Sequence, residues 1–408
     1  MLRALVADLL IDGTAAEPVK AGALTYDSGS IVDVGPVDEI VREGIEVRHF
    51  PGGTILPGLT DSHLHLGLDG EGSFEMGMLK DLTSYAAIRA YEYARRDLHS
   101  GFTTIRAMAD KGFIDVGLQR AIRDGLVKGP RIISSGHMLC ITGGRDSYVP
   151  GVSFSDNLFE ECDGIDGVTR AARRQVKYGV DWIKLGVTGA VSAGEGPPGV
   201  QQLTEAEIRA AVVVAHGQGK KVAAHAHGAA GIKAAVRAGV DSIEHGWLAD
   251  REAVDMMAAA GTYWVPTLAP LHLILLHGVE GGIPPSVVER TRRVQHNMYE
   301  VFSYGLRCGV PMVMGTDVGM PYNRHGENAV EFDLMVKAGM LEKDAIVSAC
   351  SRAAEMFGLE GVIGQLSPGH SADIVVVEGN PLEDIGALAR TRFVAKDGWI
   401  VRDDGFGE

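Results

Sequence analysis

The feature that most constrains the fold is an eightfold alternation of short β-rich runs with helical stretches between residue 55 and about residue 317. Strands that alternate with helices form parallel sheets, because each helix returns the chain to the same end of the sheet. Eight such units predict a closed (β/α)8 TIM barrel with its site at the carboxyl ends of the strands. The expected strands begin at Thr54, Phe102, Pro130, Trp182, Lys221, Ser242, Tyr263 and Pro311.

The two ends of the chain differ from this middle part. Short alternating runs separated by turns precede residue 55 and follow residue 365, a pattern typical of antiparallel β-structure. Each end is short for an independent domain, so we expect the two to pair into one small β-sandwich. The predicted α/β organisation is residues 1–54 for the first part of the sandwich, 55–365 for the barrel and 366–408 for the second part.

Composition excludes several classes of function. Hydrophobic residues make up 46% and charged residues 22%, and the net charge of −15 comes without a Lys/Arg cluster. Nucleic acid and anionic membranes are therefore not expected partners. No run approaches the ~20 apolar residues of a membrane span, and the first residues lack the pattern of a signal peptide. The four cysteines are widely spaced without a CxxC pair, which indicates reduced thiols in a cytoplasmic protein.

Side chains that can bind metals gather at the ends of the expected strands. The first strand ends in LPGLTDSHLHL, where alternation places His63 and His65 on one face and Leu64 on the other. Taken alone, this pair could equally be two solvated histidines. The other strands favour a metal site, because imidazole and carboxylate groups are ligands for zinc and similar divalent ions. Their strand-end candidates are Lys184, His225, His227, His245 and Asp317.

These motifs resemble those of the amidohydrolase superfamily of metal-dependent hydrolases, over essentially the whole chain. PGLTDSHLH is similar to the family's opening metal motif, EHG to its sixth-strand histidine, GTD to its eighth-strand aspartate, and LSPGHSADIVVVEGNP to its return to the small β domain. IKLGVTGAV, HAHG and HGENAVEFDLMVKAGM look most like the prolidase-like and imidazolonepropionase-related branch. The resemblance implies two divalent metal ions, for which we expect zinc. It assigns one ion to His63, His65 and Asp317, the second to His225 and His245, and a bridge between them to Lys184.

Lys184 requires a physical account, because an ammonium group has no lone pair for a metal ion. A lysine held neutral at a buried site can react with carbon dioxide to form a carbamate, which offers two oxygens and a negative charge. We therefore expect a carboxylated Lys184. The alternative is a lysine whose stem packs while its amine reaches outward to solvent.

The resemblance implies hydrolysis of an amide C–N bond by a hydroxide that two metal ions share. Asp317 would take the hydroxide proton and deliver it to the leaving nitrogen, while His245 or His227 would steady the oxyanion. One alternative is a deaminase of the same superfamily. Deaminases usually bind one metal, lack the fourth-strand lysine and carry a glutamate soon after the fifth-strand histidine, which HAHGAAG does not. The alternative from another class is a non-catalytic barrel scaffold.

The predicted substrate is a small molecule, either a dipeptide or an N-acyl amino acid, as for a prolidase or a carboxypeptidase-like enzyme. Arg145 lies in TGGRDS, where prolidase-like relatives often carry a histidine, and it could grip a carboxylate with two hydrogen bonds or pair with Asp146. Aryl amides, carbamates, ureas and cyclic amides are alternatives. Further candidates for substrate contact are His137, Tyr322 and Arg324. At His227 the resemblance implies contact with the substrate more readily than with a metal ion. We also expect a homo-oligomer.

Overall fold

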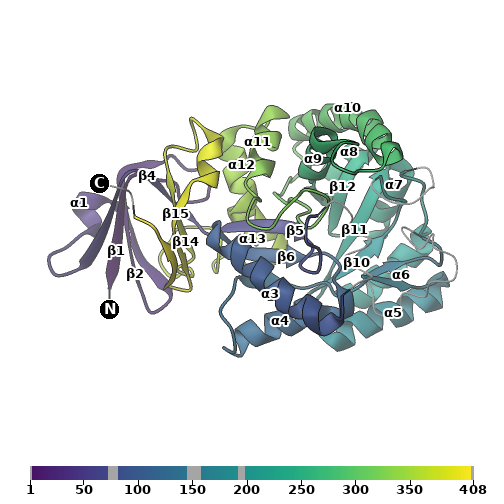
Figure 1. The fold of residues 1–408 in the computed structure, drawn as a ribbon, viewed down its shortest axis with the longest axis horizontal. Helices are drawn as coiled ribbons and strands as arrows, with labels where there is room; N and C mark the ends of the chain where they lie inside the picture. Colours follow the sequence, from purple (N-terminus) through teal and green to yellow (C-terminus); the bar gives the residue numbers. More distant parts are fainter. Residues whose placement is uncertain (1, 72–80, 145–157, 192–197, 406–408) are drawn as a thin grey trace. The chain divides into compact units, whose positions relative to one another are not determined.

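The computed structural model describes residues 2–71, 81–144, 158–191 and 198–405, and Figure 1 labels its helices and strands. The chain divides into two compact units. The first comprises Met1–Asp61, Ala94–Ile105 and Gly326–Glu408, and the second comprises Ser62–Tyr93 and Arg106–His325. Residues 94–105 and 326–365, which the sequence analysis assigns to the barrel, thus cluster with the terminal segments. The domain boundaries stay a prediction.

Both ends of the chain contribute to one seven-stranded sheet in the first unit. Its strands, in sheet order, are β16 (Trp399–Asp403), β15 (Thr391–Lys396), β14 (Ile374–Glu378), β4 (Glu46–Pro57), β1 (Arg3–Leu10), β2 (Val19–Asp27) and β3 (Ser30–Pro36). β14 pairs with β4 in the antiparallel sense, so the C-terminal strands extend a sheet that the N-terminal strands begin. The helical segments of this unit are α1 (Val37–Ile40), α11 (Val330–Lys337), α12 (Glu342–Ala349), α13 (Ser351–Phe357) and η2 (Ile385–Ala389).

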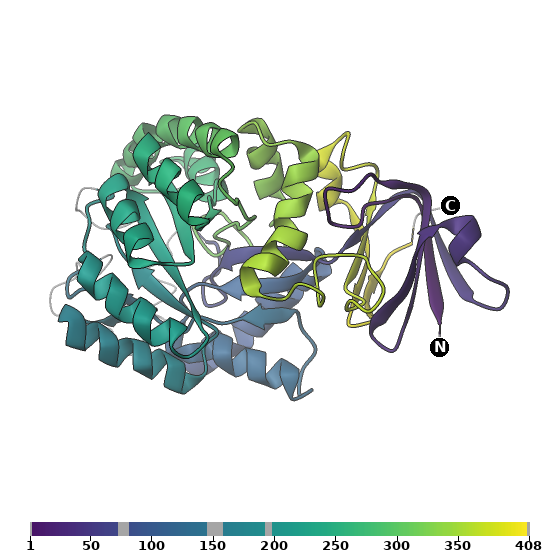
Figure 2. The ribbon, with the colours of Figure 1, turned by 180° about the vertical axis from the view of Figure 1, so that it is seen from behind.

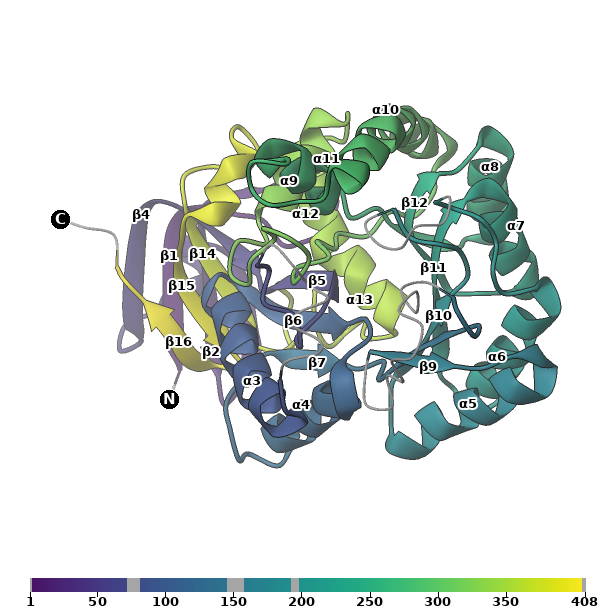
Figure 3. The same cartoon turned by 45° about the vertical axis from the view of Figure 1, so that its right-hand side comes forward.

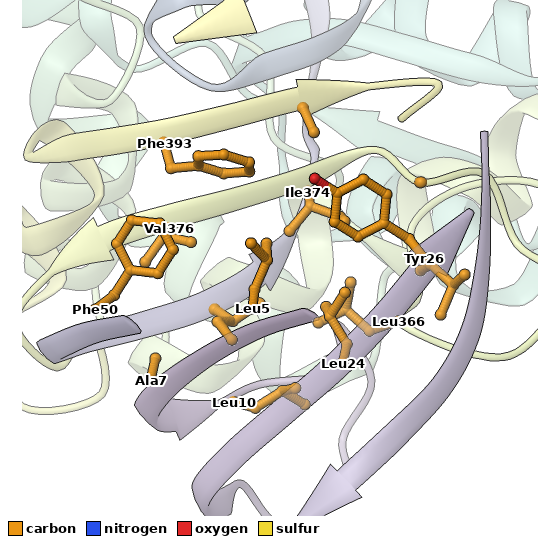
Figure 4. Packing of buried hydrophobic residues seen from close by; sticks show 14 residues of the cluster. Leu5, Ala7, Leu10, Leu24, Tyr26, Phe50, Leu366, Ile374, Val376 and Phe393 are labelled. Atoms are coloured by element: carbon orange, nitrogen blue, oxygen red, sulfur yellow. The ribbon is translucent and has the colours of Figure 1, made fainter. Parts of the chain in front are cut away.

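Apolar side chains of these strands form a common core. Figure 4 shows Leu5 and Leu24 from the N-terminal strands close to Ile374 and Phe393 from the C-terminal strands. The rings of Phe50 and Phe393 lie 5.5 Å apart in a tilted arrangement. Burying one side chain of this size stabilises a fold by roughly 1.5–3 kcal/mol. Shared burial is therefore the physical reason why the two ends of the chain fold together.

The second unit contains a six-stranded sheet whose described pairings are all parallel. In sheet order its strands are β13 (Tyr263–Val265), β12 (Ser242–Leu248), β11 (Lys221–Gly228), β10 (Trp182–Gly186), β8 (Met138–Cys140) and β9 (Phe159–Glu161). Figures 2 and 3 show the helices that alternate with them along the outer side of the strands. These helices are α5 (Gly164–Tyr178), α6 (Glu205–His216), α7 (Ala229–Ala238) and α8 (Arg251–Ala260). The alternation predicted from the sequence is confirmed here as an α/β fold.

A further sheet has the order β5 (Leu59–Leu64), β6 (Phe102–Ala107) and β7 (Arg131–Ile133). The predicted first strand is thus divided between β4 and β5, and the predicted third strand between β7 and β8. The predicted eighth strand is not a regular strand. Its backbone still bonds on both sides, since the Val313 amide donates to the Trp264 carbonyl at 2.9 Å and the Ser62 amide donates to the Met314 carbonyl at 3.1 Å. Residues 311–318 therefore lie between β13 and β5.

Local signals explain where α6 begins. The Thr204 hydroxyl accepts from the Glu207 amide at 3.3 Å, and the Glu207 carboxylate accepts from the Thr204 amide at 2.8 Å. The two bonds form a capping box, which satisfies amide groups that have no partner inside the helix. Within the described ranges no helix is both long and apolar enough to cross a bilayer. The remaining helical segments are α3 (Thr83–His99), η1 (Lys111–Phe113), α4 (Ile114–Arg123), α9 (Ala269–His277) and α10 (Pro285–Cys308).

Candidate metal centre

A small cavity in the second unit collects the side chains that the sequence places at strand ends. Its volume is about 10 Å³, which is the space that roughly one water-sized sphere requires. All seven strand-end candidates line it, together with three apolar residues that sequence reasoning missed. The complete lining is His63, His65, Met138, Lys184, His225, His227, His245, Trp247, Asp317 and Met320.

The first group of donors comes from β5 and from the segment that follows Gly315. As strand alternation requires, His63 and His65 face the same side, with ring centroids 5.6 Å apart. Asp317 Oδ1 lies 3.1 Å from His65 Nε2 and 3.5 Å from His63 Nε2. Ligand atoms of His63, His245 and Asp317 all lie within 4.8 Å of one another, a spacing that could hold a metal ion. His63, His65 and Asp317, the group predicted to hold one ion, thus lie together, but the cluster within 4.8 Å contains His245 in place of His65.

The second group of donors comes from β11 and β12. The ring of His225 lies 4.6 Å from that of His227 and 4.5 Å from that of His245. The Thr188 hydroxyl accepts from the His227 backbone amide at 2.9 Å, which anchors the end of β11. Both histidines of HAHG thus face the cavity. His245 lies between the two donor groups, because its ring is also 4.8 Å from that of His63.

Two of the cavity residues have left-handed backbones. φ is +70° at His245 and +59° at Asp317, values that L-residues other than glycine and the Asn/Asp pair rarely adopt. At His245 the turn breaks the strand alternation, so that Glu244 and His245 both direct their side chains to this centre. Strain of this kind costs on the order of 1–3 kcal/mol and gathers at functional sites.

Gly315 allows the close approach of the GTD segment to β5. A Cβ atom at this position would lie 2.5 Å from Val265 Cγ1 and 3.0 Å from the backbone nitrogen of His63. At these distances the added Cβ would collide with the Val265 side chain and with the backbone of His63, so that one of them would have to move. The glycine of GTD is thus required by packing beside the first histidine.

Hydrogen bonds fix the tautomers of three cavity histidines. His65 Nδ1 lies 3.0 Å from the Ala109 carbonyl, which can only accept. His245 Nδ1 lies 2.7 Å from the Thr267 hydroxyl, and that hydroxyl gives its own hydrogen to the Pro266 carbonyl at 2.8 Å. His63 Nδ1 lies 2.6 Å from Glu244 Oε2. In each case Nδ1 carries the hydrogen, so Nε2 carries the lone pair that metal coordination requires. The donor set therefore fits a divalent metal ion.

Lys184 is a fully buried cavity residue. It occupies the middle of β10, in register with Met138 of β8 and Ala223 of β11, and its exposed fraction is 0%. The amine is therefore enclosed and does not reach solvent. A carbamate formed on this amine would therefore lie inside the cavity with the histidines and Asp317.

Among the described residues, the predicted substrate contacts His137, Tyr322 and Arg324 lie outside the cavity lining, whereas His227 belongs to it. His137 packs against Phe113 with ring centroids 4.2 Å apart. Tyr322 stacks on His277 at 3.8 Å, and the Arg324 side chain is 51% exposed. Arg145 falls outside the described residues. A role for these residues in substrate binding stays a prediction.

The cavity residues that sequence reasoning missed are of two kinds. Met138, Trp247 and Met320 form an apolar wall, and the Trp247 indole is held by a 2.9 Å hydrogen bond to the Pro266 carbonyl. Glu244 touches a candidate ligand from behind. The signal for Glu244 was present, since it is the first residue of EHG, but only the histidine of that motif was interpreted.

Comparisons with known proteins add an independent observation. Residues 54–402 match the Amidohydrolase family. The crystal structure of an Xaa-Pro dipeptidase with bound methionine in its active site is similar over 98% of this chain and 99% of its own, with a TM-score of 0.89 and 34% identity. A prolidase complexed with N-methylphosphonate-L-proline is similar over 99% and 100%, with a TM-score of 0.88 and 31% identity. The ochratoxinase of Aspergillus niger is 29% identical over 432 aligned residues, covering 99% of this chain and 87% of the relative.

Proposed function

Since the chain belongs to the amidohydrolase family, we propose that it is a binuclear metal-dependent hydrolase that cleaves the amide C–N bond of a dipeptide or N-acyl amino acid. The observation that carries this proposal is the buried cavity in which five strand-end histidines and one aspartate converge with Lys184. The similar dipeptidase and prolidase structures support the substrate class. The similar ochratoxinase supports keeping aryl amides within the range of substrates.

The metal ions are proposed to be zinc. His63, His65 and Asp317 would hold one ion, His225 and His245 the other, and a carboxylated Lys184 would connect them. When bound, the ions supply Lewis acidity, which lowers the pKa of a water molecule and polarises a carbonyl group. Two divalent cations in one small cavity would repel each other. The carbamate of Lys184 would offset this repulsion, because it would add a negative charge between them.

Asp317 is proposed as the proton shuttle. Its Oδ1 faces His63 and His65, and its Oδ2 lies 3.9 Å from His245 Nδ1, so the carboxylate reaches the centre of the cavity. There it can accept the proton of the water that adds to the scissile carbonyl carbon. It would then return this proton to the amine nitrogen as the C–N bond breaks. The reaction consumes one water and one amide, and releases one carboxylate and one amine.

The oxyanion is proposed to be steadied from the side of β11 and β12. The His227 and His245 rings lie 5.0 Å apart and nearly parallel, and both border the apolar wall that Trp247 contributes. A developing negative charge is stabilised more strongly by such donors where water is excluded. Met138 and Met320 would help to exclude it.

We also propose that the sheets of the second unit close into the (β/α)8 barrel. Support comes from the hydrogen bonds that join residues 311–318 to β13 on one side and to β5 on the other. The shared core in Figure 4 supports a small β-sandwich formed by the two ends of the chain. A homo-oligomer and a cytoplasmic location stay predictions.

Metal analysis combined with a substrate panel tests the function. Protein purified with added zinc or manganese should contain close to two divalent ions per chain by elemental analysis. It should release free amino acid from some dipeptides or N-acyl amino acids. Aryl amides, carbamates and ureas form the second arm of the panel, and cyclic amidines, scored by ammonia release, form the third. A stoichiometry of one with full deaminase activity would overturn the proposal.

A further inference from the structure

We propose that Glu244 is a positioning residue for the metal centre: held in place by Arg106, it fixes the imidazole of His63 with Nε2 directed toward the metal ions. This inference rests on the proposed function in one respect, namely that His63 binds metal. It concerns a buried network behind the ligands rather than the ligands themselves.

The network begins with a fully buried guanidinium group. Arg106 Nη2 donates to both oxygens of Glu244, at 2.9 and 3.0 Å. Its Nε donates to the Ser62 carbonyl at 2.6 Å, and its planar group lies 4.5 Å above the ring of Trp182. Both Arg106 and Glu244 are 0% exposed. An arginine does not lose its proton in a protein, so the matching group beside it is an anion.

Every described contact of the Glu244 carboxylate comes from a donor. The Ser242 hydroxyl and Arg106 approach Oε1, while Arg106 and His63 Nδ1 approach Oε2. Oε2 therefore receives the hydrogen of the imidazole at 2.6 Å, and the ring presents its Nε2 lone pair 3.5 Å from Asp317 Oδ1. Arg106 holds His63 in two ways, through the side chain by Glu244 and through the preceding backbone by the Ser62 carbonyl.

The hydrogen-bond partner of His63 Nδ1 differs from those of His65 and His245, the other cavity histidines whose Nδ1 hydrogen bonds are described. His65 donates to a backbone carbonyl and His245 to a hydroxyl, both of which are neutral. A carboxylate partner makes the opposite imidazole nitrogen more electron-rich than a neutral partner does. His63 is therefore expected to be the strongest donor of the three, provided that Glu244 stays in place.

Metal affinity, rather than activity, tests this inference. E244Q keeps the shape of the side chain and one acceptor oxygen, but leaves the Arg106 charge without its anion. The R106M/E244Q variant removes both charges. Dissociation constants for zinc would be measured by competition with a chromophoric chelator on metal-free protein. We expect E244Q and R106M/E244Q to bind zinc about 10- to 100-fold more weakly, the usual scale for losing such a partner.

A matched control separates positioning from stability. Asp373 is a buried carboxylate that accepts from Lys396 at 3.2 Å within the seven-stranded sheet. D373N should lower the thermal midpoint while zinc affinity stays within about twofold of wild type. If the Glu244 variants lose thermal stability but bind zinc like D373N, the network is structural only and the inference fails.

A double-mutant cycle identifies the route of the effect. If Glu244 acts through His63, the loss caused by E244Q should largely disappear in an H63A background, because the imidazole it positions is no longer there. Equal losses in both backgrounds would overturn the inference. Should R106M/E244Q not fold, E244Q and its cycle with H63A decide the question. A wild-type chain that binds no zinc would instead reject the proposed function.

Discussion

Asp317→Asn separates the two roles that the structure gives to one carboxylate. Asparagine keeps the shape and one oxygen that can face His63 and His65, but it cannot accept a proton. It also tolerates the left-handed backbone of φ +59° at this position at a lower cost than alanine would. Backbone strain therefore does not confuse the result. We expect the variant to fold and to retain much of its metal, while kcat falls by at least ~10², about 2.7 kcal/mol in the barrier.

The assay measures metal content, thermal midpoint and kcat on one preparation of each protein. D373N serves as the matched control, since it makes the same chemical change at another buried aspartate. A kcat within a few-fold of wild type in fully loaded D317N would refute the shuttle role and direct attention to His245 and His227. If kcat and metal content fall in parallel, the ligand role alone accounts for the loss.

Two further predictions concern other buried ionisable groups. Lys184→Ala should lose metal and activity together, and short carboxylic acids added with metal should restore part of both by occupying the vacated bridge; wild-type activity in K184A would exclude a carbamate at this position. Burial and the neighbouring Asp115 carboxylate hold the pKa of Asp110 well above its ordinary value of 3.8. The protonated carboxyl therefore stabilises the fold fully below pH 3.8, and this stability is lost as pH rises through the raised pKa. As pH rises from 4, the free energy of unfolding of D110N, measured by urea titration, should therefore increase relative to that of the wild type. A difference that does not change with pH would contradict this reasoning.

Local patterns were sufficient to find the donors on β5 and β11. Residues two apart in a strand share a face whatever the rest of the chain does, so SHLH and HAHG required no knowledge of distant residues. The collection of these strand ends at one cavity required only that the sheets be parallel, which the alternation of strands and helices indicates.

Features that depend on long-range contact were not predictable from the same patterns. Alternation alone places Glu244 and His245 on opposite faces, and only the left-handed backbone at His245 brings both to the centre. The partner of Glu244 is Arg106, 138 positions away. The expected eighth strand is not regular, because its backbone bonds to β13 and β5 over only a few residues before the chain turns at Asp317.

The Arg106–Glu244 pair is not readily explained by stability. Removing two charges from water costs several kcal/mol per ion, and packed apolar residues of similar volume often stabilise a fold as well or better. Apolar residues could fill the same space between β6 and β12, but they could not offer an anion to the Nδ1 hydrogen of His63. Nor could they hold the Ser62 carbonyl one residue before that ligand. A glutamine at position 244 could accept through its oxygen or donate through its nitrogen, so the ring could adopt either tautomer, and one of the two places a hydrogen where the metal ion must bind. What only the Arg106–Glu244 pair provides is control of the His63 imidazole. A pair retained mainly for stability would not need to contact a metal-binding residue at all.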